Sequence, residues 1–220
     1  MTERATSDER RVVLEGVASR VLELPADRVG RVGIDGVDGA GKTSMADELA
    51  EVLAPSGRPV IRASVDGFHN PRAVRYRLGA DSPEGFYRDS YDYDTLTRVL
   101  LDPLSPGGSG RFRRAVFDVD TDTQVDAGEE QAPPNAILLF DGIFLHRPEL
   151  RDYWDLSVFL RVDWLRNHHL RHVPADDPMR TRQNRYLEGQ NIYLRACRPW
   201  ELASIVIDNH DLGSPFVVRD

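Results

Sequence analysis

Short apolar runs alternate with amphipathic stretches along most of the chain, and this alternation gives the first structural prediction. Apolar runs rich in Val, Ile and Leu predict buried strands of a parallel sheet, at 31–35, 60–65, 136–140, 156–160 and 205–207. Apolar residues spaced three and four apart predict helices, at 8–24, 42–53, 72–78, 94–101, 163–172 and 180–195. Strands that alternate with helices predict an α/β fold with a doubly wound, mainly parallel sheet.

One segment between two turn-rich stretches departs from this alternation. The turn-rich stretches are Asp102–Gly110 and Ala127–Asn135, where Gly, Pro, Ser and Asp are frequent. Between them we expect Arg111–Asp118 and Thr121–Val125 to pair as a small β-hairpin, inserted at about 111–126. A plain surface β-ribbon satisfies the same pattern.

Composition narrows the class of protein. The 220 residues are 40% hydrophobic and 29% charged, which predicts a globular chain with one domain over 1–220. The net charge of −8 argues against a nucleic-acid partner, whose binding face would be basic. No apolar run approaches the ~20 residues of a membrane span. The start lacks a secretory signal and the single Cys197 cannot form an internal disulfide, so we expect a cytoplasmic protein.

A glycine-rich segment predicts a phosphate-binding loop, or P-loop. Its sequence GVDGAGKT matches G-x-x-x-x-G-K-[ST], between a predicted strand and a predicted helix. Such glycines let backbone N–H groups surround phosphate oxygens at a helix N-terminus. Lys42, the only lysine beside 27 arginines, would reach the β- and γ-phosphates, and the Thr43 hydroxyl would ligate Mg²⁺. We therefore predict nucleoside triphosphate binding by Gly36, Val37, Asp38, Gly39, Ala40, Gly41, Lys42, Thr43 and Ser44.

Two other predicted strands end in Asp-Gly pairs, and each pair can supply a carboxylate. We expect the strand at 60–65 to lie beside the P-loop strand, so that Asp66 faces the γ-phosphate at the carboxyl edge of the sheet. That position suits a base that accepts the proton of an attacking hydroxyl, and also a metal ligand. Asp141, after the strand at 136–140, is a candidate Walker-B carboxylate for Mg²⁺. A turn-forming Asp-Gly pair explains either segment without any function.

The stretch from 161 to 198 reverses the acidic character of the chain, because it carries eight arginines. We predict a helical lid over about 163–198 that closes over phosphate charge. Arg171 is the candidate catalytic arginine, and Arg166 and Arg185 are candidate substrate contacts. A solvated helix face with surface ion pairs explains the same composition. The histidines of this stretch do not predict a metal site, because adjacent side chains diverge on a helix.

These segments, taken in order, resemble the phosphoribulokinase/uridine kinase family of P-loop kinases, and within it the uridine kinase-like branch. The resemblance runs from about Val32 to the C-terminus and rests on GIDGVDGAGKT (33–43), VDGFH (65–69), YDYDTL (91–96), ILLFDGIFL (137–145), WDLSVFLRVD (154–163), RYLEGQNIYL (185–194) and VIDNHD (206–211). It implies a nucleoside kinase-like P-loop NTPase fold and ATP- and Mg²⁺-dependent phosphorylation of a hydroxyl. It also implies that Asp66 is the catalytic aspartate and that Asp141 replaces the glutamate of uridine kinases.

Two departures from the family's pattern concern the acceptor. Asp89 occupies the neighbourhood of an acid that contacts the ribose diol in uridine kinases. Phe117 and Asp122 replace the Tyr and His of the hairpin that touches the pyrimidine. We therefore expect uridine and cytidine to be poor or unselective acceptors. The aspartates suit a polyhydroxylated or amine-bearing acceptor, with His69 and Tyr76 as neighbours.

The leading hypothesis is a uridine kinase-like phosphotransferase with an alcohol group as acceptor, using ATP and Mg²⁺. Its partner would be a small-molecule hydroxyl acceptor, with no nucleic acid and no membrane, and the sequence leaves a homo-oligomer open. The enzymatic alternative is a kinase for a non-nucleoside alcohol, such as a sugar or a pantothenate-like compound. A nucleotide-dependent switch is the alternative from another class. It is weaker because no second lysine exists to build the Asn-Lys-x-Asp motif that reads guanine.

Overall fold

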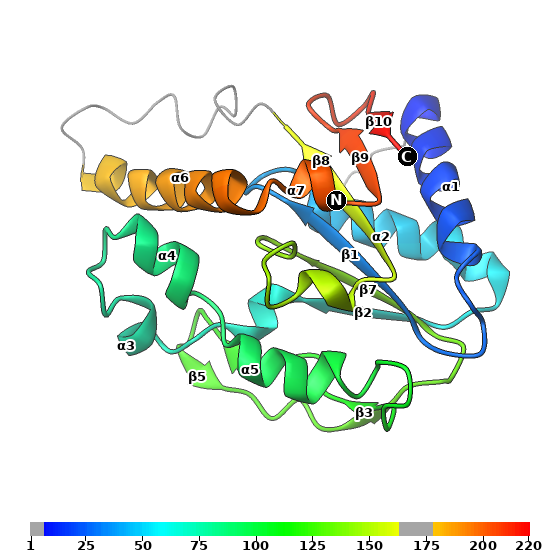
Figure 1. Ribbon diagram of the computed structural model, residues 1–220, viewed down its shortest axis with the longest axis horizontal. Coiled ribbons are helices and arrows are strands. Elements are labelled where there is room, and N and C mark those ends of the chain that lie inside the picture. The colour runs from blue at the N-terminus through cyan, green and yellow to red at the C-terminus, as the bar shows by residue number, and fades with distance from the viewer. Residues whose placement is uncertain (1–6, 163–177) are drawn as a thin grey trace.

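The computed structural model describes residues 7–162 and 178–220, with side chains for 7–162 and 184–220, and is organised around a central sheet (Figure 1). Within these residues the sheet has six strands in the order β10-β9-β8-β1-β7-β2. The strands are β1 (Gly30–Gly36), β2 (Val60–Ser64), β7 (Ile137–Gly142), β8 (Leu156–Arg161), β9 (Ile205–Asp208) and β10 (Phe216–Arg219). Only β10, on one edge, runs antiparallel to its neighbour. The expected α/β fold with a mainly parallel sheet is confirmed.

The strand order corrects one expectation, because β7 separates β1 from β2. Leu138 of β7 lies opposite Arg31 of β1 on one side and opposite Ile61 of β2 on the other. The physical reason is burial: every residue of β7 is buried, as suits a central strand, whereas β2 alternates between buried and half-buried positions. The strand that leads to Asp66 is therefore the second neighbour of the P-loop strand.

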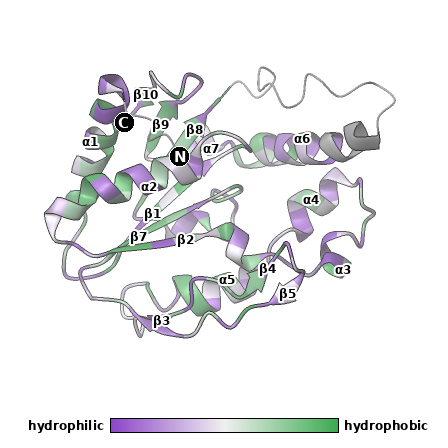
Figure 2. Ribbon diagram, turned by 180° about the vertical axis from the view of Figure 1, so that it is seen from behind, coloured by the Kyte–Doolittle hydropathy of each residue, from purple (hydrophilic) through white to green (hydrophobic). Residues whose placement is uncertain are grey.

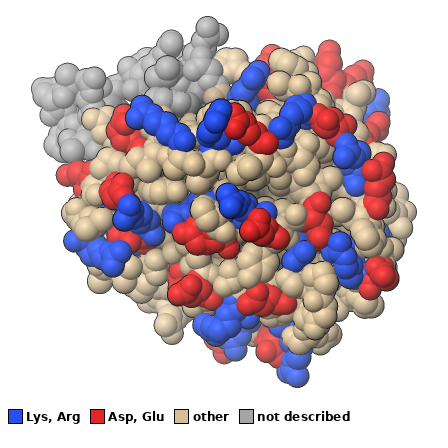
Figure 3. Space-filling view, in the orientation of Figure 1, with Lys and Arg blue, Asp and Glu red and all other residues tan. Residues whose placement is uncertain are grey.

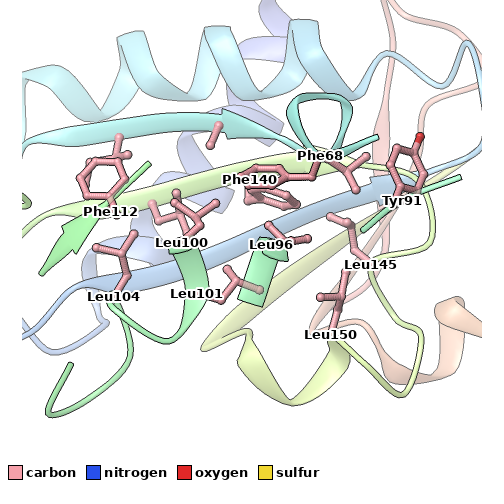
Figure 4. Close-up of a cluster of buried hydrophobic side chains, with 14 of the residues drawn as sticks. Phe68, Tyr91, Leu96, Leu100, Leu101, Leu104, Phe112, Phe140, Leu145 and Leu150 are labelled. Carbon is pink, nitrogen blue, oxygen red and sulfur yellow. The ribbon is translucent and has the colours of Figure 1, made fainter. Parts of the chain in front are cut away.

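Helices cover both faces of the sheet. On one face α1 (Asp8–Leu22) and α2 (Lys42–Leu53) bury Val17, Met45 and Leu49 against β1, β7, β8 and β9. The other face is covered by α4 (Pro83–Asp89), α5 (Tyr93–Leu96) and the π-helical segment η3 (Thr97–Leu101). Figure 4 shows the apolar cluster beneath them, where Phe68 and Phe140 face Leu96 and Leu100. Between these layers, the carboxyl ends of the parallel strands lie along one side of the sheet, called the carboxyl edge below.

The described residues form further helical elements at both ends of the strands. They are the short helix α3 (Arg72–Arg75), the long helix α6 (Pro178–Cys197), α7 (Pro199–Leu202), and the 3-10 turns η1 (Ala54–Ser56), η2 (Val65–Phe68) and η4 (Arg151–Tyr153). Helix α6 contains the helix expected at 180–195 and lies beside α4 (Figure 1). The helix expected at 163–172 lies outside the described residues.

The region after η3 differs from the expected hairpin. The β4 (Phe117–Asp118) and β5 (Thr123–Gln124) strands do pair, but β3 (Arg111–Phe112) pairs with β6 (Glu130–Gln131) instead. The continuous strand expected over 111–118 is therefore wrong. Its middle is bonded elsewhere, because Arg113 N donates to Val99 O and Val116 N donates to Gly67 O. Helix α4 was also missed, since its residues read as a polar loop.

The distribution of polar residues follows the layers. Hydrophobic residues concentrate in the central strands, whereas β5 is hydrophilic (Figure 2). On the face seen in Figure 3 basic and acidic side chains are interspersed. None of the helices in the described ranges is long and apolar enough to cross a membrane.

Candidate active site

The segment between β1 and α2 adopts a tight loop, as the glycine motif predicts. Gly39 and Gly41 have φ angles of 73° and 83°, a left-handed region that glycine adopts without strain. A Cβ atom on Gly41 would lie 3.0 Å from the Asn209 amide nitrogen. Helix α2 begins at Lys42, directly after Gly41, which has no side chain to cap it. The first N–H groups of α2 are therefore suited to a phosphate.

Asn209, near the end of the chain, holds this loop in place. It is fully buried just beyond β9, and its side-chain amide donates to the Ala40 carbonyl at 2.7 Å. Its own carbonyl accepts from Arg10 at 3.2 Å, and Arg10 pairs with Glu48 of α2 at 2.6 Å. Sequence reasoning did not single out Asn209, although an amide directly after an apolar strand was a readable signal.

Lys42 and Thr43 begin α2 and point to different parts of the site. The Lys42 ammonium donates to the Val37 carbonyl at 2.9 Å, so it folds back over the loop. The Thr43 hydroxyl donates to Asp141 at 2.9 Å, at the end of β7. Arg62 of β2 also reaches Asp141, at 3.1 Å, and was not foreseen from the sequence. The Thr43 hydroxyl and the Asp141 carboxylate therefore meet at the carboxyl edge of the sheet.

This donor set fits Mg²⁺ that is bound together with a nucleotide. Mg²⁺ prefers oxygen ligands and is usually held by one or two carboxylates, substrate phosphates and water. No cluster of three His, Cys, Asp or Glu side chains suited to a metal occurs in the parts of the chain that are described. Thr43 and Asp141 would supply the protein's share, with the phosphates completing the site.

Asp66 lies in η2, immediately after β2, and is held by aromatic neighbours. Its carboxylate accepts a hydrogen bond from Tyr91 at 3.2 Å, and the Tyr91 ring contacts His69 with centroids 4.5 Å apart. Burial, followed by the negative charge of Asp66, raises the pKa of Tyr91 well above its ordinary value. Burial also lowers the pKa of His69, against the opposing effect of Asp66. The phenol therefore remains a donor to Asp66.

Asp38, within the P-loop, couples electrostatically to Asp66. Asp38 keeps contact with solvent, yet the surrounding protein desolvates it and raises its pKa, with a smaller contribution from Asp66 and an opposing one from Lys42. The three charged groups are therefore close enough to interact, although β2 is not adjacent to β1. Gln190 of α6 accepts a hydrogen bond from the Asp38 backbone N–H at 2.7 Å.

The aspartates predicted to contact the acceptor are paired with arginines. Asp89 is buried and receives two hydrogen bonds from Arg77, at 2.9 and 2.6 Å. Asp122 accepts from the Arg72 backbone at 2.8 Å and from Arg75 at 3.0 Å. Desolvation raises the pKa of Asp122, but these hydrogen bonds outweigh it and leave the pKa below its usual value. The chain's own groups therefore occupy both oxygens of Asp89 but only Oδ1 of Asp122.

The other predicted acceptor residues lie around the same segment. Phe117 is buried in β4, whereas the Tyr76 ring carries the Arg75 and Arg185 guanidinium groups at 5.5 and 4.4 Å from its centroid. Arg185 is 3% exposed and donates to the Ala80 and Arg75 carbonyls at 2.7 and 2.9 Å. It therefore ties α6 to the chain between α3 and α4. Arg166 and Arg171 lie outside the described residues.

A buried polar cluster beneath the P-loop was missed by sequence reasoning. It joins Asp35 of β1, His146, Ser157 of β8 and Tyr193 of α6 through hydrogen bonds. The one readable signal was Asp35 itself, a carboxylate at the end of a predicted buried strand. Its partners come from distant parts of the chain and carry no local pattern.

The comparisons with known proteins agree with this architecture. The sequence profile of the Phosphoribulokinase / Uridine kinase family matches residues 31–167. Uridine kinases of Leuconostoc citreum (strain KM20) and Ligilactobacillus salivarius (strain UCC118) are 25% identical over 138 residues and 26% identical over 137 residues. Each match covers 60% of this chain, and 61% and 60% of the two relatives respectively. The chain thus spans about three fifths of the length of the curated relatives it matches.

A solved structure supports the fold in the same way. The structure of a possible uridine kinase from Bacillus stearothermophilus superposes with a TM-score of 0.72 at 24% sequence identity, covering 89% of this chain and 97% of that one. At this identity the likeness concerns the fold. The matched profile, however, covers more than half of the 220 residues, from the P-loop strand past β8. The chain belongs to the phosphoribulokinase/uridine kinase family.

Proposed function

We propose that this chain is an ATP- and Mg²⁺-dependent kinase that transfers the γ-phosphoryl group to a hydroxyl of a small molecule. The observation that carries the proposal is that Lys42, the Thr43–Asp141 pair and Asp66 lie at the carboxyl ends of the strands, with Asp66 two residues after Ser64, which pairs with Asp141. Membership of the family supports a phosphotransferase. The arrangement also supports a role for the loop in binding the phosphates, for Thr43 and Asp141 in holding the metal and for Asp66 as the base that acts on the acceptor.

Each group has a distinct task in this proposal. The P-loop N–H groups bind the phosphates, and Lys42 swings from the Val37 carbonyl to the β- and γ-phosphates. Mg²⁺ at Thr43 and Asp141 would supply positive charge to neutralise phosphate oxygens. Asp66 accepts the proton of the attacking hydroxyl, and the hydrogen bond from Tyr91 orients its carboxylate.

The acceptor is a nucleoside on the family resemblance, but one observation favours a second candidate, a non-nucleoside alcohol. Phe117 is buried and has no polar atom on its side chain, and Asp122 accepts from the Arg72 backbone and from Arg75 through Oδ1, so the pair offers a pyrimidine edge neither a phenol nor an imidazole. His69 and Tyr76 remain the proposed neighbours of the acceptor. A site that lacks such polar partners for the nucleobase discriminates weakly between acceptors.

ADP release from ATP, measured with and without an alcohol, tests the proposal. The panel comprises uridine, cytidine, the purine nucleosides and simple sugars, each compared by kcat/KM under one set of conditions. A kinase shows strongly acceptor-dependent ADP release, whereas a nucleotide switch hydrolyses ATP at the same rate without any acceptor. Acceptor-independent release would therefore overturn the proposal.

The same panel decides between the two acceptor classes. We expect uridine and cytidine to show no strong preference over the other alcohols. A kcat/KM for uridine or cytidine far above every other acceptor would contradict that expectation and favour plain uridine kinase activity.

A further inference from the structure

A buried polar cluster lies directly beneath the P-loop and has no task in the proposed chemistry. Asp35 is fully buried at the end of β1, and one carboxylate oxygen accepts from the Gly36 backbone N–H at 2.7 Å. The other oxygen accepts from the Tyr193 hydroxyl and lies 2.6 Å from His146 Nδ1. Tyr193 and His146 are 1% and 2% exposed. The carboxylate therefore has three neighbours that can donate to it.

The cluster extends behind His146 and leaves no member without a partner. His146 Nε2 lies 2.9 Å from the Ser157 hydroxyl, and that oxygen accepts from the Ser204 backbone N–H at 3.2 Å. The Tyr193 oxygen in turn accepts from the His146 backbone N–H at 3.1 Å. A proton on Nδ1 directed at Asp35, with Nε2 accepting from Ser157, satisfies every one of these groups.

The carboxylate gives the P-loop something that an apolar side chain would not. Burying a charged group is costly, and apolar packing would fill the same space more cheaply. What Asp35 adds is a fixed acceptor for the Gly36 N–H, which orients the first peptide of the loop. Hydrogen bonds inside such a dry network hold their geometry firmly.

Helix α6 contacts the P-loop at a second residue as well. Gln190 and Tyr193 are three residues apart and therefore share one face of the helix. Gln190 accepts from the Asp38 backbone N–H at 2.7 Å and donates to its carboxylate at 3.4 Å. The P-loop is thus held by α6 at Asp35, before its first glycine, and at Asp38, within the loop.

We infer that Asp35, His146 and Tyr193 are positioning residues that set the P-loop for nucleotide binding, with Tyr193 as the link from α6. All three are buried, and their effect passes through the Gly36 peptide. The inference rests on the proposed function, because it concerns the affinity of the P-loop for a nucleotide.

Tyr193→Phe tests the inference by removing one hydroxyl. We measure the Kd of ADP with Mg²⁺ by titration calorimetry, together with the Tm of the free protein. Losing one hydrogen bond to a charged carboxylate should raise the Kd by about tenfold. Tyr153→Phe is the matched control, since its hydroxyl donates to Asp102 at 2.6 Å near the amino end of β8, at the opposite edge of the sheet. The control should leave the Kd unchanged.

A second pair of variants separates positioning from bulk stability. His146→Asn keeps an N–H donor for Asp35, whereas His146→Leu keeps none, so the Asn variant should bind ADP more tightly than the Leu variant. A Tyr193→Phe protein that binds ADP as tightly as the wild type would overturn the inference, as would equal weakening in both tyrosine variants. A wild-type protein that fails to bind ADP would instead overturn the proposed function.

Discussion

The donor and acceptor halves of the candidate site are built in different ways. The donor half is one contiguous loop, Gly36 to Ser44, whose backbone forms the cradle and whose position is fixed by Asp35 and Asn209. The acceptor half is assembled from side chains of α3, the β4–β5 turn and α6, tied by arginines such as Arg75. Under the proposed function, a backbone cradle would bind what all nucleotides share, whereas side chains would decide which acceptor is taken.

Burial separates the two halves further. Asp35 and Asn209 have no solvent-exposed surface, so the groups behind the P-loop act in a dry environment. In the acceptor half the Arg77 side chain is 61% exposed although its partner Asp89 is buried. Removing Arg77 would therefore leave a buried carboxylate without its partner, which is costly to the fold. Both halves thus depend on buried polar groups, but in the acceptor half one partner of the ion pair lies at the surface.

The largest expected effect is in the donor half. Lys42→Ala should abolish phosphoryl transfer and leave the fold intact, because the ammonium contacts only the Val37 carbonyl in the described structure. Donors of this kind contribute roughly 3–4 kcal/mol to the transition state. ATP turnover with an acceptor, together with thermal unfolding, measures both consequences. Near-normal turnover by a folded variant would contradict the P-loop assignment.

Asp66→Asn tests the residue that is proposed to act between the donor half and the acceptor half. It should keep ATP binding and lower turnover by about 10²–10⁴-fold, the usual contribution of a general base. Single-turnover kinetics and nucleotide titration report the two quantities separately. Asp94→Asn, which changes an exposed carboxylate of α5, is the control and should be neutral. Normal turnover in Asp66→Asn would make Asp66 a turn residue.

Arg185→Ala addresses the acceptor half alone. Losing its bonds to the Ala80 and Arg75 carbonyls should loosen that segment and lower kcat/KM for the acceptor by about tenfold, the scale of one hydrogen bond to a charged group. ATP affinity should change less. Arg195→Ala, an exposed arginine of the same helix, provides the control. Equal losses of ATP binding and turnover would show that the two halves are not separable in this way.

The smallest effect on activity is expected from Asp155→Asn, far from both halves at the amino end of β8. Burial opposes ionisation of Asp155, but hydrogen bonds from Arg31 and Arg28 outweigh it and leave its pKa below the ordinary value. The carboxylate therefore stabilises the fold at pH values above its pKa in the unfolded chain, near 4. This stabilisation is lost as the pH falls through the lower pKa that the group has in the folded chain. Asp155→Asn should cost about 1–3 kcal/mol at pH 7.

Urea unfolding at pH 7 and pH 3 checks that sign. The difference in the free energy of unfolding between the wild type and Asp155→Asn should be smaller at pH 3 than at pH 7. The kcat at pH 7 should stay within about twofold of the wild type, because Asp155 does not contact the site. A gap that is equal at both pH values would show that the Arg31 ion pair is not its source.

The comparison also explains which features the sequence could predict. The P-loop could be read because its function resides in consecutive residues, and β7 because its run is apolar throughout. The strand that lies next to β1 could not be predicted, because the order of strands in the sheet depends on which strand is buried on both sides. The pairing of Asp122 with Arg75 and the link from Arg185 to α3 join residues far apart in the chain. Such pairs leave no local pattern in the sequence, so the arrangement of the acceptor half could not be predicted from it.

The solitary lysine has a practical consequence for chemistry done on this protein. Amine-reactive reagents find one side-chain target in the 220 residues, and it lies at the start of α2. Apart from an N-terminal amine, a single covalent adduct therefore reports on the P-loop alone. A nucleotide that engages the ammonium should shield it from acylation. The mass of the intact chain would then count the occupied sites directly, without any assay of turnover.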